Sequence, residues 1–594
     1  VLILLALLAG MAWAADPYVG YVYPAGVQAG TTNRLIVGGQ FFWNLKGVEA
    51  GPGVRVLGFV LVPNFPPPVG GQRRYLVKWL DRIAEGDRTQ PRLPVEDEFY
   101  TDWRSNRWYS ALGELDAGQL ALVEHFLYTP RNALQMSPAL SQKLHVTVAV
   151  DKDAAPGVRA LRVYGPQGFS PPRPFLVSAA PHVVEPLYVP PHRTQPAPPV
   201  VTNLPCVLDG QILPGSTDRW ILPLAKGRTV TLRVTARELQ PYIGDAVPGF
   251  FNPVLRLVNR AGDQLAFADD FFYHPDPALT FTAPADDDYT LEIHDNLYRG
   301  REDFTYEIAV REGAHLPSVR TLSLSPLPAW EVPPEAQIRT FSGVIARPGQ
   351  VDVHTVSVPE PCERTFDLLA RRAGSPLDAR VTVWRGADRI ARIDDVTNTF
   401  LFGSVIQAEC DPVGRVKFDR PGTYEIRVED EAGHGGADFF YTLRLHRPAP
   451  RFEVWCLKSG LALRAWWGGA RVGFEVVRRD GFDGSVTLEE NDFVKFKPNV
   501  IPAASNRVVV TAISKLQKPL APTNMTLTAS AVVNGVRVTV PVTPADEYNQ
   551  AFAWNHLVPA RTFAFVGLPG SRPKPKKNAP PPKKAPVPPK VKKD

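Results

Sequence analysis

Cysteine and methionine are scarce in this sequence of 594 residues, which holds 4 and 3 of them. The cysteines lie far apart and lack the Cys-x-x-Cys spacing of structural zinc sites, which excludes a zinc finger or ribbon. After residue 14 no stretch of roughly 20 apolar residues follows, so we expect no membrane span in the mature chain.

The sequence also lacks the common catalytic motifs. It has no HExxH, no GxSxG, no Walker loop and no glycine-rich dinucleotide turn, and its 11 histidines are scattered. We therefore expect a protein that is not an enzyme. A hydrolase with an unrecognised site stays an alternative, because any two of the 60 acidic residues could meet in space.

Proline and glycine, in contrast, are abundant, with 61 and 45 residues. Short alternating runs rich in valine, threonine and leucine lie between these turn residues, which is typical of β-strands. At roughly 100 to 200 residues per domain, the length predicts three to five domains. The sequence thus predicts a mainly β protein of several tandem β-sandwich domains.

The two ends of the sequence differ from the rest. Residues 1–14 contain the apolar run VLILLALLAG, followed by the small residues Ala12 and Ala14, which predicts a signal peptide. We therefore expect an exported protein that is periplasmic, at the cell surface or secreted.

Residues 571–594 form a Pro/Lys-rich segment that we predict to be disordered. This tail has nine basic residues and one acidic residue, a charge of +8, so the net charge of +6 leaves −2 elsewhere. A folded part without excess positive charge argues against specific nucleic-acid binding. The tail either contacts anionic polymers or is a solvated flexible end.

Residues 15–183 predict a sandwich with a helical insertion at about residues 70–130. Within the insertion, residues 72–84 and 116–128 have apolar side chains at three- and four-residue spacing. The strand segments around it resemble the Ig-like (IPT/TIG-like) domain of exported bacterial proteins of planctomycete type. The matching positions are Pro24, Gly26, Gly30, Gly157, Arg159, Leu161, Arg162, Gly168, Ser170 and Phe175.

Residues 201–313 and 338–447 form a divergent tandem repeat. Asp218 aligns with Asp352, Tyr289 with Tyr424, and Tyr306 with Tyr441, at offsets of 134, 135 and 135 residues. The double aspartates at 269–270 and 394–395 align at an offset of 125, which indicates loops of different length.

Each copy resembles the bacterial pre-peptidase C-terminal domain, whose pattern has an early aspartate, a double-aspartate centre and a closing pair of tyrosine strands. The first copy carries this pattern at Asp218, Leu255, Leu257, Gly262, Leu265, Asp269, Asp270, Tyr289, Leu291, Ile293, Asp295 and Tyr306. It departs from the pattern at Asn252, where the family commonly has aspartate and the second copy has Asp378. The resemblance implies a jelly-roll-like β-sandwich.

Some members of this family bind calcium through loop carboxylates, which implies a calcium cofactor here. The candidate ligands are Asp218, Asp263, Asp269, Asp270, Asp352, Asp378, Asp394 and Asp395. The alternative is that these aspartates cap turns by bonding to their own backbone.

Cysteine pairing depends on these domain boundaries. Of the four cysteines (Cys206, Cys362, Cys410 and Cys456), only Cys362 and Cys410 fall inside one predicted domain. We therefore predict a disulfide bond between these two in an oxidising compartment. Four buried free thiols are the alternative.

Residues 450–568 predict a last sandwich with Asp-Gly turns, and their segments RRDGFDGSVTL and QAFAWNHLVPA resemble parts of the same exported proteins. Beside the first double aspartate, Phe271, Phe272 and Tyr273 are candidate ligand-binding residues, with core packing as the alternative. We expect a binding or adhesion protein whose partner is an envelope polysaccharide, extracellular matrix or a protein. The alternative function is that of an accessory or structural partner of a secreted peptidase.

Overall fold

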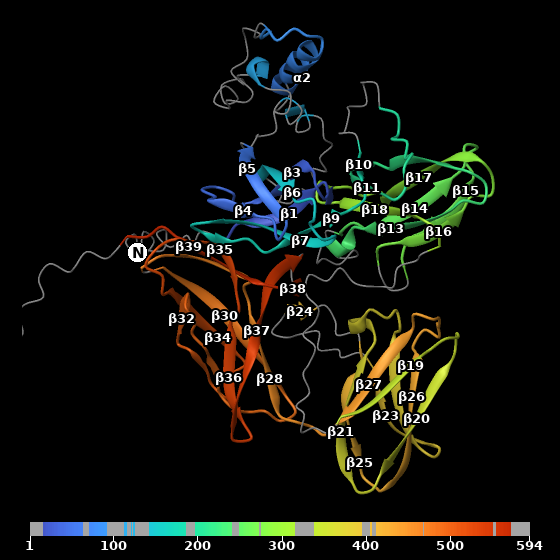
Figure 1. Cartoon of the computed structure of the whole chain (residues 1–594), viewed down its shortest axis with the longest axis vertical. Coiled ribbons are helices and arrows are strands. Elements are labelled where there is room, and N and C mark those ends of the chain that lie inside the picture. The colour runs from blue at the N-terminus through green and yellow to red at the C-terminus, as the bar shows by residue number, and fades with distance from the viewer. Residues whose placement is uncertain are drawn as a thin grey trace, which may run out of the picture.

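A computed structural model gives the fold of the chain (Figure 1). It describes residues 16–62, 71–91, 112–115, 120, 123–124, 127, 142–185, 196–239, 249–271, 275–314, 338–394, 404–406, 411–466, 468–550 and 554–571. Paired sheets follow one another along the chain, which confirms the predicted mainly β fold of tandem sandwiches. No helix among these residues has both the length and the apolar character of a membrane span.

The first sandwich pairs two sheets around a core that includes Leu35, Val146 and Phe175. One sheet has the order β1 (Tyr18–Tyr23), β3 (Thr32–Gln40), β6 (Gln142–Val150), β5 (Val54–Val62). The other has the order β2 (Gly26–Gln28), β9 (Arg173–Ser178), β7 (Gly157–Gly165), β4 (Gly47–Glu49), with β8 (Gly168–Phe169) beside β7.

The helical insertion in the first sandwich is confirmed. Helix α2 (Gly71–Ala84) buries Leu76, Trp79 and Leu80 on one face. These side chains pack with Leu112, in the 3-10 turn η3 (Leu112–Glu114), and with the helical residues Leu120, Val123 and Leu127. The apolar spacing read from the sequence therefore forms a small core of its own.

The two repeats share one topology. The first repeat has one sheet in the order β10 (His182–Val184), β11 (Cys206–Gln211), β18 (Thr305–Glu312), β13 (Thr229–Thr235), β16 (Ala278–Thr282). The facing sheet has the order β12 (Asp218–Leu224), β17 (Asp287–Asp295), β14 (Pro253–Val258), β15 (Gln264–Ala268). The 3-10 turn η5 (Arg237–Leu239) follows β13. The second repeat has one sheet in the order β19 (Arg339–Val344), β27 (Phe440–His446), β21 (Cys362–Leu369), β25 (Val413–Phe418). The facing sheet has the order β20 (Val351–Val358), β26 (Gly422–Asp430), β22 (Ala379–Arg385), β23 (Asp388–Ile393). The 3-10 turn η7 (Arg371–Ala373) follows β21. Apart from β10, the strands correspond one to one, so the repeat seen in the sequence is a repeat of structure.

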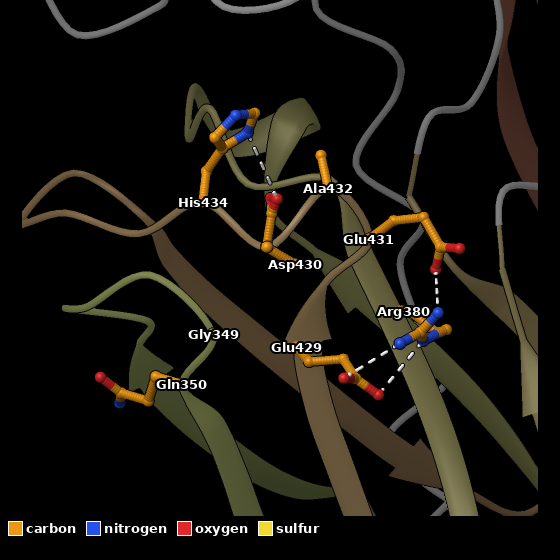
Figure 2. A pocket seen from close by; sticks show the side chains of 9 residues that line it. Gly349, Gln350, Arg380, Glu429, Asp430, Glu431, Ala432 and His434 are labelled. Atoms are coloured by element: carbon orange, nitrogen blue, oxygen red, sulfur yellow. Dashed lines mark hydrogen bonds and ion pairs between the residues drawn. The ribbon is translucent and has the colours of Figure 1, made fainter.

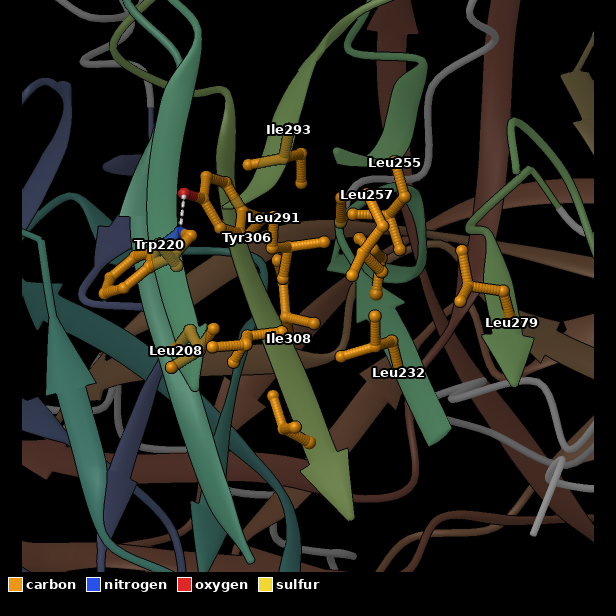
Figure 3. Close-up of a cluster of buried hydrophobic side chains, with 14 of the residues drawn as sticks. Leu208, Trp220, Leu232, Leu255, Leu257, Leu279, Leu291, Ile293, Tyr306 and Ile308 are labelled. Carbon is orange, nitrogen blue, oxygen red and sulfur yellow. Dashed lines mark hydrogen bonds between the residues drawn. The ribbon is translucent and has the colours of Figure 1, made fainter. Parts of the chain in front are cut away.

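Each repeat has the same hydrogen bond between its two sheets. Tyr306 on β18 donates its hydroxyl to Asp218 on β12 at 2.8 Å, and Tyr441 on β27 donates to Asp352 on β20 at 2.9 Å. In the first repeat, Trp220 Nε1 also donates to the Tyr306 hydroxyl, inside the apolar core (Figure 3). The polar pair thus crosses the sandwich with both partners satisfied.

A glycine makes room for each of these tyrosines. Gly210 pairs with Tyr306 across β11 and β18, and Gly343 pairs with Tyr441 across β19 and β27. A Cβ at Gly343 would lie 2.5 Å from both the Tyr441 hydroxyl and the Asp352 carboxylate. A side chain at this position would therefore displace the hydrogen bond.

The last sandwich has one long path of strands and one short sheet. The path has the order β32 (Val494–Lys497), β34 (Arg507–Ser514), β30 (Gly469–Arg479), β28 (Arg451–Cys456), β37 (Val536–Gln550), β36 (Thr528–Val533), β31 (Val486–Leu488), β33 (Val500–Ile501), with β38 (Trp554–Pro559) beside β37. The short sheet has the order β29 (Gly460–Arg464), β39 (Phe563–Leu568), β35 (Leu520–Met525).

The last sandwich packs against the first through buried polar groups. Arg162 Nη1 on β7 donates to the Ser459 hydroxyl at 2.7 Å, and Ser459 in turn bonds to Asp546. Phe169 joins Ala564 and Val566 in an apolar cluster beside this contact. Two parts of the chain separated by 297 residues are therefore fixed to each other.

Arg173 lies where three sandwiches meet. It belongs to the first sandwich, donates to Leu239 O of the first repeat at 3.3 Å, and lies 5.4 Å from the ring centroid of Tyr548 in the last sandwich. The Tyr548 hydroxyl donates to Pro172 O, and its ring joins the core of the first repeat. Arg173 is only 1% exposed, so these contacts replace its hydration.

The second repeat contacts the last sandwich in two places. Strand β24 (Ser404–Ile406) pairs in parallel with β38. Arg415 on β25 forms an ion pair with Asp480 at 2.9 Å, and Asp480 also lies 3.6 Å from Arg451. Asp480, which follows β30, is thus a connecting residue between the two sandwiches.

We predict that Gly343→Ala destabilises the second repeat, because the added methyl group collides with the Tyr441 hydroxyl and the Asp352 carboxylate. Overpacking of this kind costs about 1–3 kcal/mol. Differential scanning calorimetry of the full chain should show a lower melting temperature. Gly58→Ala, a strand glycine with no atom within 4 Å of an added Cβ, is the control and should melt like the parent chain. Equal melting of both variants would contradict the role of Gly343.

Candidate functional site

The structure places the eight predicted calcium ligands in different surroundings. Asp218 and Asp352 accept the inter-sheet tyrosine hydrogen bonds. The Asp263 carboxylate accepts a hydrogen bond from the Asn259 side-chain amide at 2.9 Å in the hairpin turn between β14 and β15, and the Asp263 backbone N–H donates to Asn259 Oδ1. The predicted set is therefore not gathered around one point.

The other candidates lie near strand ends. Asp269 and Asp270 are exposed after β15. Asp378 pairs with Arg371 at 3.0 Å, and Asp394 pairs with Arg392 at 2.6 Å. Asp395 lies outside the described residues. Across the described part of the chain, no group of three or more His, Cys, Asp or Glu side chains is close enough to hold a metal ion.

The candidate ligand-binding aromatics and the cysteines are only partly described. Phe271 is half-buried after β15, whereas Phe272 and Tyr273 lie outside the described residues. Cys206 and Cys456 are buried and Cys362 is half-buried, and none of the three is bonded to another described cysteine. Because Cys410 is outside the described residues, the bond between Cys362 and Cys410 stays a prediction.

A cluster of buried and half-buried carboxyl groups that the sequence did not reveal joins the first sandwich to the first repeat. Asp209 Oδ1 accepts the backbone N–H of Gly26 at 2.9 Å. Glu185 accepts Gln211 N at 2.7 Å and the Tyr23 hydroxyl at 3.4 Å. Both carboxyl groups thus bridge the two domains.

Burial dominates the acid–base behaviour of this cluster. It raises the pKa of Asp218 to about 6 and that of Glu307 to about 8, the latter with help from the nearby Asp209. It also raises the pKa of Glu185, which hydrogen-bonds to Asp218. The charge of Asp218 raises the pKa of Glu185 further, because two nearby carboxyl groups disfavour ionisation of both.

One chain of hydrogen bonds in this junction has the residue types of a hydrolase triad. Ser178 Oγ lies 2.9 Å from His182 Nε2, and His182 Nδ1 lies 2.5 Å from Asp209 Oδ2. Ser178, however, also donates its hydroxyl to Ala180 O at 2.8 Å. A serine whose proton is held by a backbone carbonyl is not activated by the histidine, so this chain fixes the connection between domains.

A separate pocket of about 250 Å³ lies at the end of β26 in the second repeat (Figure 2). Its polar lining comes from Gln350, Arg380, Glu429, Asp430, Glu431 and His434. Arg380 bridges Glu429 at 3.0 Å and Glu431 at 2.7 Å, as Figure 2 shows. Asp430 lies on the other side of the pocket, next to His434.

Comparison with known proteins gives no family for this chain. No protein-family description matches it, and no curated protein matches it.

Among solved structures, the chain is similar to a β-glycosidase from Bacteroides vulgatus (11% identity, TM-score 0.18, covering 35% of this chain and 27% of the glycosidase). It is also similar to the ICAM-5 D1-D4 ectodomain fragment (11% identity, TM-score 0.13, covering 89% of this chain and 98% of the fragment). A third similar structure is Bacteroides ovatus SGBP-B in complex with a mixed-linkage heptasaccharide (10% identity, TM-score 0.15, covering 73% of this chain and 74% of SGBP-B). The chain spans about a quarter of the glycosidase. At these TM-scores the likeness does not indicate a function for this chain.

The carboxyl cluster between the first sandwich and the first repeat predicts a specific pH dependence of the free energy of unfolding. The folded-state pKa of Glu307, about 8, is above its ordinary value near 4.5, so the folded state holds one more proton between these values. Stability from this group is complete below about pH 4.5 and is lost as the pH rises to about 8. We expect Glu307→Gln to remove a slope of up to about 1.4 kcal/mol per pH unit in this window.

Urea unfolding at pH 5.5, 7 and 8.5 measures this slope. The control is Glu312→Gln, an exposed glutamate on the same strand that pairs with Arg228. It should keep the parent slope. The same slope in Glu307→Gln and the parent chain would show that Glu307 is ionised throughout.

Proposed function

We propose that this chain is an exported binding or adhesion protein without catalytic activity, and that its two repeats are pre-peptidase C-terminal domains. Its partner is an envelope polysaccharide, extracellular matrix or a protein. Fixed contacts between sandwiches support this proposal, because they hold the outer faces of several domains at set distances. Such an arrangement suits contact with a large or repetitive partner at several points.

The observation that carries the proposal is the exposed edge of the first repeat. Strand β15 is the last strand of its sheet, and its Leu265 and Phe267 are 39% and 51% exposed. Asp269 and Asp270 follow directly, exposed, and Phe271 is next. An edge strand with apolar side chains beside carboxylates offers both backbone pairing and side-chain contacts to a partner.

The second repeat lacks this combination. Ile390 on β23 takes the place of Leu265, but Arg392 takes the place of Phe267 and pairs with Asp394. The edge of the second repeat is therefore occupied by an ion pair where the first presents an aromatic ring. We assign the main contact surface to the β15 edge, with calcium held there by Asp269 and Asp270 as a further part of the proposal.

Co-sedimentation of the full chain with isolated bacterial envelope, insoluble polysaccharides and collagen tests this proposal, in calcium and again in EDTA. We expect pelleting with one of these materials, and a reduction of about tenfold or more in apparent affinity for Phe267→Ser, as loss of a central aromatic contact produces. Asp269→Ala with Asp270→Ala should remove any calcium dependence. Ile390→Ser in the second repeat is the matched control.

A variant that ends at residue 570 separates charge attraction by the basic tail from specific binding. If the chain stays in solution with every material, the adhesion proposal fails. The accessory role beside a secreted peptidase then becomes the function to test.

Labelling with a fluorophosphonate probe tests the hydrolase alternative. We expect no covalent adduct on Ser178, because its hydroxyl is hydrogen-bonded to Ala180 O. Intact-mass spectrometry of the parent chain and of Ser178→Ala checks this. A probe adduct that disappears in Ser178→Ala would show a reactive serine and contradict the non-catalytic reading.

A further inference from the structure

The loops that end β17 and β26 occupy equivalent places in the two repeats, and each surrounds a buried aspartate. In the first repeat this residue is Asp295, which is fully buried. Its carboxylate accepts the backbone N–H groups of Asn252, Leu297 and Arg299 at 2.9, 3.0 and 3.1 Å. The Arg299 guanidinium completes the shell, with Nε 2.8 Å from Oδ2 and Nη2 2.9 Å from Oδ1.

The second repeat has the same backbone frame around Asp430. Glu431 N donates to Asp378 O at 2.8 Å, as Asn296 N donates to Asn252 O at 2.9 Å in the first repeat. Gly433 N donates to Asp430 O at 3.1 Å, and its counterpart Tyr298 N donates to Asp295 O at 2.8 Å. Gly433 and Tyr298 both have a positive φ, of 74° and 54°. The two loops therefore form the same kind of anion cage.

The side chains of the two cages differ at one decisive position. His434 stands where the first repeat has Arg299, and its Nδ1 is 3.8 Å from Asp430 Oδ2, beyond hydrogen-bond distance. Asp430 is 4% exposed, and neither of its oxygens has a hydrogen-bond partner of normal geometry. Burial raises the pKa of Asp430, partly offset by the nearby N–H groups of His434, Asp378 and Ala432.

No other described cation compensates Asp430. Arg380 is held by Glu429 and Glu431 across the pocket, and Arg371 is held by Asp378. The pKa of Asp378 is raised by burial and by the neighbouring Asp430, Asp394 and Glu431, although Arg371 lowers it. The pocket of about 250 Å³ thus has an excess of negative charge on the side where Asp430 lies (Figure 2).

We propose that this pocket binds a guanidinium group from outside the chain, that of an arginine side chain on a partner protein. The first repeat shows that a carboxylate in this cage takes a guanidinium in bidentate contact, and the second repeat keeps the cage and lacks the arginine. A divalent metal fits less well, since no three described acidic, histidine or cysteine side chains converge there. This site lies in the second repeat and is independent of the adhesion surface proposed for β15.

Titration of the full chain with N-acetyl-arginine methylamide, followed by ligand-observed NMR at pH 8, tests the proposal. N-acetyl-lysine methylamide and calcium chloride are the comparison ligands. The variant His434→Arg supplies from within the chain the guanidinium that the first repeat already has. We expect this variant to melt at a higher temperature and to bind the arginine probe at least about tenfold more weakly than the parent chain.

Two further variants make the test independent of one substitution. Asp430→Asn should also weaken probe binding about tenfold or more, because it removes the charge and one acceptor. Arg299→His should open the equivalent cage in the first repeat and raise the number of bound probe molecules by one. The proposal is overturned if His434→Arg binds the probe like the parent chain, or if the parent chain binds calcium or the lysine probe but not the arginine probe.

Discussion

The arrangement of this molecule depends on satisfying one buried guanidinium. Arg173 is 1% exposed and has contacts in the first sandwich, the first repeat and the last sandwich. A charge taken out of water is tolerated only where carbonyl groups and aromatic rings replace the lost hydration, and here those groups come from three domains. Each domain is therefore needed to complete the surroundings of the same side chain, which makes their relative positions part of the fold.

Inside each repeat, a second polar interaction has the corresponding role. The tyrosine–aspartate bond crosses from one sheet to the other, and the facing glycine leaves it room. Apolar packing alone permits small sliding movements between sheets, whereas a single buried hydrogen bond fixes one alignment. The aspartates that a family resemblance would assign to metal binding thus include two that accept a hydrogen bond from a tyrosine hydroxyl.

Sequence patterns predicted the elements better than the contacts between them. Alternating apolar residues identified the sandwiches, and three- and four-residue spacing identified α2, because both patterns reflect burial of one face. The repeat alignment also paired Tyr306 with Tyr441 correctly. It could not show that Arg162 meets Ser459, since these residues are 297 positions apart. Nor could it mark His434, because a histidine four residues after an aspartate becomes informative only when its counterpart is seen to be a bonded arginine.

The contact between the first and last sandwiches also sets an order of events during biosynthesis. Arg162 leaves the ribosome long before Ser459 and Thr562, which accept its hydrogen bonds from the last sandwich. Until Thr562 has been made, this face of the first sandwich holds a cation without its partners from the last sandwich. The first sandwich can therefore bury this face only after the last sandwich has been synthesised, although its own strands are complete by Ser178.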